Sequence, residues 1–153
     1  MMNNDVIRSV RYMLNISDQK IVDIFKLADF EIDLPDVQDF LINEEDPHYL
    51  ECDDEAMAYF LDGLVYFKRG KDENRPALPI ELPMTNNIIL KKLRVAFELK
   101  EDDILDIFSD AGFRVGRAEL SAFFRRKGHF NYRECGDQML RNFLKGLTLR
   151  LRS

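Results

Sequence analysis

The stretch YLECDDEAMAYFLDGL at residues 49–64 returns as YRECGDQMLRNFLKGL at residues 132–147, which lies 83 positions further along the chain. The match extends outward from these stretches without a gap, so that residues 3–70 align with residues 86–153 and nineteen aligned positions are identical. Most of the identical residues are apolar and recur at helical spacing. Because a duplicated unit keeps its core positions while its surface diverges, the chain is a tandem repeat of one helical unit.

The spacing of apolar residues predicts four helices in each copy, and strand signals are weak throughout. The asparagine pair at the start of each copy consists of good N-cap residues, so we expect the first helix to begin after it. In the first copy, one predicted helix follows Asn3-Asn4, the second spans residues 17–29, the third starts near Pro35 and the fourth spans residues 53–67. In the second copy, the first helix follows Asn86-Asn87, and the other three span residues 100–112, 117–127 and 136–150.

The expected fold class is all-α, with two homologous four-helix repeats packed together. We divide the chain into an acidic helical repeat at residues 1–70, a proline-containing linker at residues 71–85 and a basic helical repeat at residues 86–153, with net charges of −10, −1 and +5. Because the copies share a core, this divergence lies on their surfaces, where opposite fields steer association between halves, between molecules or toward an anionic partner. The repeats either dock within one chain or exchange across a dimer.

Composition indicates a cytoplasmic protein. The chain holds no run of 18 apolar residues, and its first residues mix Asn, Asp and Arg where a signal peptide has an apolar core. The two cysteines, Cys52 and Cys135, are aligned with each other and are too few for a secreted disulfide scaffold. We therefore expect reduced thiols and no membrane partner.

Two segments of the repeat carry a family resemblance. Tyr-x-Glu-Cys-x-Asp precedes the fourth predicted helix in both copies, and Phe-Leu-x-Gly-Leu follows within that helix at residues 60–64 and 143–147. A unit of this length with these segments, repeated twice, resembles the YehS-like bacterial proteins, a family classed as a domain of unknown function. The resemblance covers nearly the whole chain. It implies a small, cytosolic, all-helical protein and supplies no catalytic residues.

The Tyr-x-Glu-Cys-x-Asp segment is the most specific polar feature, since it occurs in both copies. We interpret it as structural, with Cys or Asp near the N-cap of the fourth helix and with Tyr and Cys as packing residues. The alternative is a thiolate nucleophile activated by a helix N-terminus, but the neighbouring carboxylates raise a thiol pKa and no aligned His is available as a base. The residues concerned are Tyr49, Glu51, Cys52, Asp54, Tyr132, Glu134, Cys135 and Asp137.

A zinc site is the other chemistry that these cysteines suggest. His48 with Cys52, and His129 with Cys135, give one His and one Cys per copy, and four such ligands can in principle hold zinc. However, the histidines are 81 positions apart where every matched pair is 83 apart, and the chain has no C-x-x-C pair. We therefore expect surface histidines, no metal and no other cofactor.

Arg11 and Arg94 are a matched pair of basic residues in the first predicted helix of each copy. We expect each to pair with a matched acid, such as Asp23 or Asp106, and so to hold two helices together. Phosphate binding is the alternative use of these arginines. Because the sequence has no Gly-rich phosphate loop, the structural pairing is favoured.

A nucleic-acid interface is predicted from the second copy alone. Its second helix, a turn at Gly112 and its third helix form a loose helix-turn-helix pattern, in which Phe108 is larger than the residue that this turn usually carries. The matching helix of the first copy is acidic, and a duplex would repel it. The basic residues that can meet phosphates are Arg114, Arg117, Arg125, Arg126 and Lys127.

The sequence thus favours a non-enzymatic, cytosolic module for protein interaction or regulation, whose partner is another protein or a second copy of the chain. The alternative is a nucleic-acid-binding regulator that uses the basic second repeat from Arg114 to Lys127. A continuous basic face in that region would favour nucleic acid, whereas an exposed apolar groove would favour a protein partner. We expect no catalytic residues.

Overall fold

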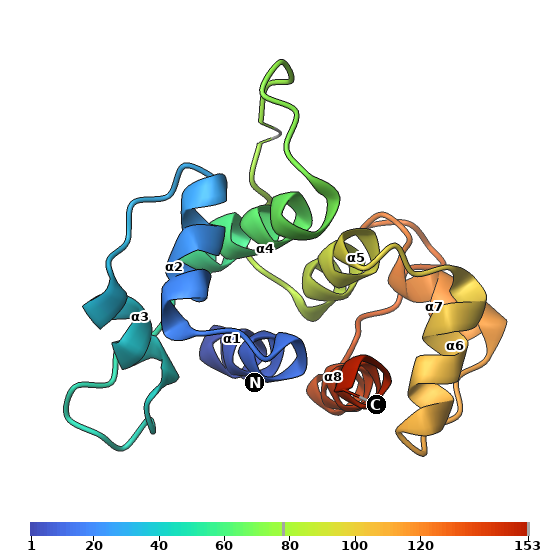
Figure 1. The fold of residues 1–153 in the computed structure, drawn as a ribbon. Helices are drawn as coiled ribbons and strands as arrows, with labels where there is room; N and C mark the ends of the chain where they lie inside the picture. The colour runs from blue at the N-terminus through green and yellow to red at the C-terminus, as the bar shows by residue number, and fades with distance from the viewer. Residues whose placement is uncertain (78, 153) are drawn as a thin grey trace. The chain divides into compact units, whose positions relative to one another are not determined.

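The computed structural model describes residues 1–77 and 79–152, and every regular element within them is a helix. The prediction of an all-α fold is therefore confirmed. The chain divides into two compact units, residues 1–84 and residues 85 onward, each with four helices (Figure 1). The helices are α1 (Asn3–Leu14), α2 (Asp18–Leu27), α3 (Leu34–Leu41) and α4 (Asp54–Arg69) in the first unit, and α5 (Asn86–Ala96), α6 (Glu101–Asp110), α7 (Arg117–Phe123) and α8 (Asp137–Arg152) in the second.

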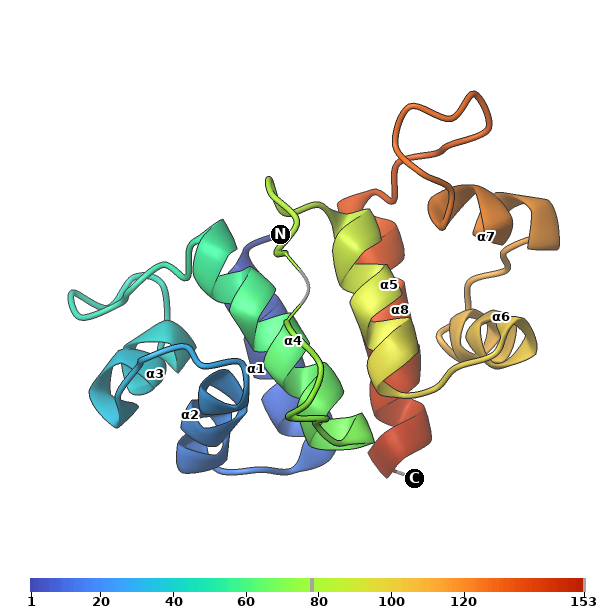
Figure 2. The same ribbon diagram turned by 90° about the horizontal axis from the view of Figure 1, so that it is seen from above.

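The first unit is built around the contact between α2 and α4, and α3 packs against both α2 and α1 (Figure 2). Phe25 of α2 and Phe60 of α4 are fully buried at this contact, with their ring centroids 5.3 Å apart. Tilted aromatic pairs at such distances add to the free energy of burying the rings. Both phenylalanines are among the residues that match between the two copies.

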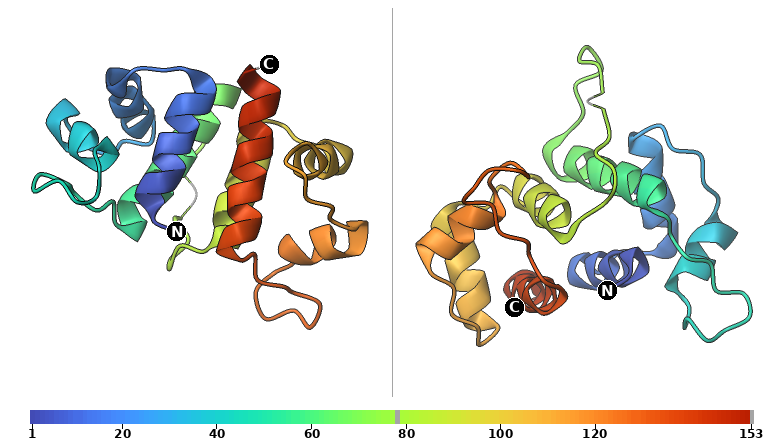
Figure 3. Two further views of the ribbon diagram at one scale, coloured as in Figure 1. Left: turned by 90° about the horizontal axis from the view of Figure 1, so that it is seen from below. Right: turned by 180° about the vertical axis from the view of Figure 1, so that it is seen from behind.

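The second unit repeats this arrangement. Its α6 packs on α8 and on α7, and α5 runs beside α8 (Figure 3). Phe108 and Phe143, the counterparts of the phenylalanine pair in the first unit, are fully buried with their ring centroids 5.6 Å apart. The matched phenylalanine pair therefore packs the second helix against the fourth helix in both units.

The first helix of each unit begins earlier than the sequence predicts. Asn3 and Asn86 are the first residues of α1 and α5, and the N-cap residues are Met2 and Thr85. The hydroxyl of Thr85 accepts a hydrogen bond from the amide of Ile88 at 3.2 Å, which satisfies one of the open donors of the first turn. The predicted capping role of the asparagines is wrong, and their side chains are free to reach across the unit.

The third helix of the second unit is shorter than predicted. α7 ends at Phe123, and Gly128 takes a left-handed conformation with φ of 97° in the turn that follows. Arg125, Arg126 and Lys127 therefore lie in a loop after the helix and not on a helical face. The fourth helices, by contrast, extend two residues beyond their predicted ends, to Arg69 and Arg152.

The proline-containing linker belongs to the first unit, whose boundary falls after Met84. The ammonium group of Lys71 donates to the carbonyl of Leu27 at 2.7 Å and lies over the ring of Tyr66. At the other end, the amide of Met84 donates to the carboxylate of Asp54 at 3.1 Å. The linker is thus attached to the first repeat near both of its ends. Among the described residues, no helix has both the length and the apolarity that a membrane crossing requires.

A glycine allows the closest helix contact in each unit. A Cβ atom added to Gly63 of α4 would lie 2.0 Å from the carbonyl oxygen of Ile24, and one added to Gly146 of α8 would lie 2.0 Å from that of Ile107. Real Cβ atoms do not approach backbone atoms so closely, and the neighbouring backbone cannot rotate away. The two matched glycines therefore set the distance between α2 and α4 and between α6 and α8.

Gly63→Ala and Gly146→Ala should each lower the free energy of unfolding by about 1–3 kcal/mol, as overpacking of a well-filled core does. Urea denaturation measures this change. Lys145→Ala, at the exposed neighbouring position on α8, is the matched control and should change stability by less than about 0.5 kcal/mol. A glycine variant as stable as the control would contradict the close contact.

Candidate functional site

A buried asparagine in the first turn of α1 holds the segment that precedes α4. The amide nitrogen of Asn4 donates to the carbonyls of Phe40 and Leu50 at 3.0 and 2.9 Å, and its oxygen accepts from the backbone amide of Cys52 at 2.9 Å. Asn4 has no solvent exposure. One side chain thus pairs three backbone groups that no helix satisfies.

The second unit contains the same bonds between matched residues. Asn87 donates to the carbonyls of Phe123 and Arg133 at 3.0 and 2.8 Å, and accepts from the amide of Cys135 at 2.9 Å. It is 8% exposed. Because the bonds recur with almost equal lengths in units of different surface charge, they belong to the shared fold. We refer to Asn4 and Asn87 as the clamp asparagines.

The asparagine that precedes each clamp asparagine binds the matched aspartate at the start of the last helix. The side-chain amide of Asn3 donates to the carbonyl of Cys52 at 3.0 Å and to the carboxylate of Asp54 at 3.0 Å. In the second unit, Asn86 makes the corresponding bonds to Cys135 and Asp137, at 3.0 and 2.8 Å. The aspartates are the first residues of α4 and α8, where a negative charge also suits the helix dipole.

Both cysteines are buried, and their thiols are poor nucleophiles. Burial, together with the nearby carboxylates of Asp53, Asp54 and Glu51, raises the pKa of Cys52 to about 12. Burial, together with the carboxylate of Asp137, raises the pKa of Cys135 to about 12 as well. A reactive cysteine needs the opposite environment, one that stabilises the thiolate.

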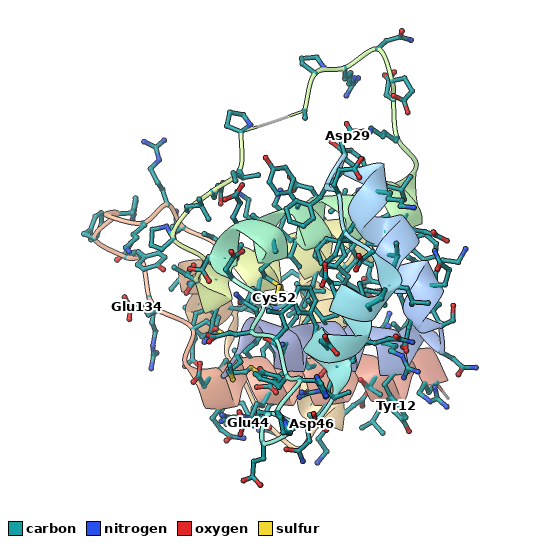
Figure 4. The ribbon with its side chains drawn as sticks, turned by 90° about the vertical axis from the view of Figure 1, so that its left-hand side faces the viewer. Tyr12, Asp29, Glu44, Asp46, Cys52 and Glu134 are labelled. Carbon is teal, nitrogen blue, oxygen red and sulfur yellow. The ribbon has the colours of Figure 1, made fainter. Side chains whose placement is uncertain are left out.

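The remaining members of the repeated segment are peripheral. The hydroxyl of Tyr49 donates to the sulfur of Met2 at 3.5 Å, and Tyr132 is half-buried. Glu51 and Glu134 are exposed, and Glu134 is labelled in Figure 4. The N-cap of α4 is Asp53, whose carboxylate accepts from the amide of Ala56 at 2.8 Å. Within the repeated segment, the cysteine and the aspartate of each copy are therefore the members that the first-turn asparagines bind.

Both histidines lie in exposed loops, whereas both cysteines are buried. The ring nitrogen Nδ1 of His129 accepts from the backbone amide of Asn131 at 3.0 Å. The backbone amide of His48 donates to the carboxylate of Asp46 at 2.8 Å. Within residues 1–77 and 79–152, no three His, Cys, Asp or Glu side chains gather closely enough to hold a metal ion.

Arg11 and Arg94 do not pair with the matched aspartates as the sequence suggests. Arg11 binds Asp18 at 2.6 Å, and Asp23 instead lies near Lys20. Arg94 donates to the backbone carbonyl of Leu99 at 3.2 Å. The predicted ion pairs with Asp23 and Asp106 are wrong because the acid nearest to the end of α1 is at the start of α2, and apolar spacing does not reveal this.

The five basic residues predicted to contact nucleic acid fall into two groups. Arg117, the first residue of α7, is bound to Asp102 at 2.6 Å and to Glu101 at 3.6 Å, so its charge is largely compensated within the unit. The others are exposed and form no ion pair with any part of the chain that the structure describes: Arg114, Arg125, Arg126 and Lys127. Three of these four are consecutive in the loop after α7.

The same loop presents an aromatic side chain that the sequence prediction missed. Phe130 is 89% exposed, and the ring of His129 stacks on it with centroids 4.8 Å apart. We call residues 125–133 the basic loop. The signal for it was the alternation of Arg, Lys, His and aromatic residues between α7 and α8, which is typical of surfaces that bind nucleic acid.

The first unit has a matching loop of opposite charge. It spans residues 42–50, with Glu44 in the position of Lys127 and Pro47 in the position of Phe130. Figure 4 shows Glu44 and Asp46 pointing outward at the edge of this unit. The clamp asparagine binds the last residue of each loop, Leu50 or Arg133, so the two loops are held at the same point of the fold.

A cavity of about 280 Å³ lies beside the basic loop. It is formed by the end of α5, the start of α6 and the second half of α7 with the residues that follow. The lining side chains combine two arginines with a hydroxyl, an aromatic ring and one carboxylate: Arg94, Glu101, Leu120, Ser121, Phe124 and Arg125.

These features define the class of protein: a tandem repeat of one four-helix unit, in which an asparagine fixes the last connection. The chain belongs to the family whose model is described as "Protein of unknown function (DUF1456)", which matches residues 3–70 and 86–153. The "Uncharacterized protein YehS" of Escherichia coli (strain K12) is 47% identical over 150 residues, covering 98% of this chain and 96% of that protein. No solved structure matches the chain. The family predicted from the repeated segments is confirmed.

Both thiols should be almost inert in the folded protein. With a pKa of about 12, about one thiol in ten thousand is ionised at pH 8, whereas an unperturbed cysteine is substantially ionised there. Ellman's reagent should therefore react with the native protein much more slowly than with the protein unfolded in guanidinium. Rapid reaction of one thiol in the native state would contradict the structural assignment.

Removal of a clamp asparagine should destabilise the protein strongly. Asn4→Ala and Asn87→Ala leave buried backbone groups unpaired, and each such group costs about 1–3 kcal/mol. Asn74→Ala, in the exposed part of the linker, is the control and should have little effect. Thermal or urea unfolding measures the difference, and a clamp variant that unfolds with the control would contradict the role of these bonds.

Proposed function

We propose that this protein is a non-enzymatic regulatory module that binds single-stranded nucleic acid through the basic loop of its second unit. The observation that carries the proposal is the exposed ring of Phe130, located in a loop with Arg125, Arg126 and Lys127, none of which is paired within the described structure. With 89% exposure, the ring of Phe130 is accessible to a base, and His129 stacks beside it.

The chemistry of the loop suits a single strand. Every base has a face on which an aromatic ring can stack, and this contact contributes about 1–3 kcal/mol per base. The three cations supply contacts to the phosphates, which provide most of the affinity and make it depend on salt. A duplex fits less well, because α7 ends before these cations and so cannot present them from a helix in the major groove.

The absence of enzymatic activity is part of the proposal and rests on how the repeated polar residues are used. The asparagines, the aspartates and the cysteines of the repeated segment are bound to one another or buried. Groups engaged in this way are unavailable to a substrate. Many of the residues that differ in charge between the units, in contrast, are exposed on the two loops.

A protein partner is the other class considered. The exposed apolar side chains outside the basic loop are spread over α1, α4, α5, α8 and the connecting segments, and include Tyr12, Leu50 and Phe67. None of these side chains lines the cavity beside the basic loop or the smaller cavity between α4 and the linker. The observations therefore favour nucleic acid, and a protein partner becomes an outcome of the experiment below.

Fluorescence anisotropy with a labelled oligothymidine of about 15 nucleotides, and with a duplex of equal length, tests the proposal at low salt. We expect the single strand to bind more tightly than the duplex. Phe130→Ala should weaken binding roughly tenfold, as the loss of one stacking contact does. Arg125→Glu with Arg126→Glu should abolish it, and raising the salt should weaken the wild-type complex steeply.

The first repeat supplies matched controls. Pro47 and Asn43 of the acidic loop align with Phe130 and Arg126 of the basic loop. Pro47→Ala and Asn43→Glu should therefore leave binding unchanged. No binding to either probe at low salt would overturn the proposal and leave a protein partner. An affinity that is equal for the duplex and unaffected by Phe130→Ala would overturn the single-strand assignment.

A further inference from the structure

The cavity in the second unit differs from the corresponding region of the first unit in a way that points to a ligand. In the first unit, Arg11 is bound to Asp18 by a bond of 2.6 Å. The counterparts of these residues are Arg94 and Glu101, and both line the cavity. The repeated arginine has therefore changed from one half of an ion pair to part of a cavity wall.

The counterparts of Arg11 and Asp18 have different partners in the second unit. Arg117 stands where the first unit has Leu34, and its guanidinium lies 3.6 Å from the carboxylate of Glu101. Glu101 is thus paired with Arg117 of α7, which also binds Asp102 at 2.6 Å. Arg94 instead donates its Nε–H to Leu99, and its guanidinium lies 4.6 Å from the ring centroid of Phe124.

The other lining residues have changed in the same direction. The second unit has Ser121 and Arg125 where the first has Gln38 and Ile42, and it has Phe124 where the first has Leu41. A second guanidinium, a hydroxyl and an aromatic ring thus face the same space of about 280 Å³. Guanidinium groups are suited to phosphate because their planar N–H groups match two of its oxygens.

We propose that this cavity binds the phosphate ester of one nucleotide, with Arg94, Arg125 and Ser121 as hydrogen-bond donors to the phosphate. The volume lies near the lower limit of small-molecule sites, which suits a single nucleotide and not a dinucleotide. The nucleotide is either free in solution or a member of a bound strand. The second source rests on the function proposed above, and the first does not.

Substitution of Glu101 tests whether the cavity binds an anion, because the expected change is a gain in affinity. Its carboxylate faces the cavity, and although Arg117 compensates part of its charge, it repels a bound phosphate. Glu101→Gln should therefore tighten binding several-fold. Loss of folding cannot produce a gain in affinity, so this variant separates electrostatic recognition from damage to the structure.

The experiment uses titration calorimetry of the full chain with adenosine monophosphate, with adenosine and with inorganic phosphate, beside the oligothymidine assay. Ser121→Gln installs the residue of the first unit and should weaken binding at least tenfold, whereas Glu101→Gln should strengthen it. Gln38→Ser, the reverse exchange in the first unit, is the matched control and should change nothing.

The outcomes distinguish the two sources. Binding of adenosine monophosphate that responds to Ser121→Gln and Glu101→Gln, but not to Phe130→Ala, supports a free nucleotide and holds even if the basic loop binds no strand. If only the oligothymidine responds to these two variants, the phosphate comes from a strand. Adenosine binding as tightly as its monophosphate, or no response of either probe to the two variants, would overturn the proposal.

Discussion

The amide side chain of the clamp asparagine is the constraint on which the rest of each unit depends. The segment before α4 or α8 is neither helix nor strand, yet part of it is buried, and buried backbone groups without partners are costly. Asn4 and Asn87 supply those partners from the first turn of α1 and α5. The start of the last helix is fixed as a result, and the glycine in that helix then reaches its close contact with α2 or α6.

This constraint leaves the loops between the third and fourth helices free to diverge. Each loop is attached at its end by a bond from the clamp asparagine to a backbone carbonyl, and a carbonyl is available whatever the side chain. The loop can therefore change its charge without loss of the fold. One copy has become acidic and the other basic and aromatic, so the duplication combines an unchanged core with two different surfaces.

Much of the fold could be predicted from the sequence because helical spacing and internal repetition report directly on the core. The buried cysteines were also predictable, since acidic neighbours and the lack of an aligned base argued against thiol chemistry. The role of Asn4 was not, because an asparagine at the start of a helix resembles an N-cap, and its true partners are 36 to 48 positions away.

The candidate site was predicted only in part. The positive charges of the second repeat were visible, but Arg117 is used internally, and α7 ends before Arg125. Phe130 was missed because an aromatic residue in a sequence is normally assigned to a core, and only the structure shows its exposure. The cavity required knowledge of how Arg94 and Glu101 are paired, which depends on the register between helices and not on spacing along one helix.

Amide hydrogen exchange of Cys52 and Cys135 in the wild-type protein tests the central claim most directly. Both amides lie outside any helix, yet each donates to a clamp asparagine at 2.9 Å. The account predicts that they exchange as slowly as the buried amides of α4 and α8, because they open only when the unit unfolds. Exchange as rapid as that of the exposed loop amides around them would contradict it.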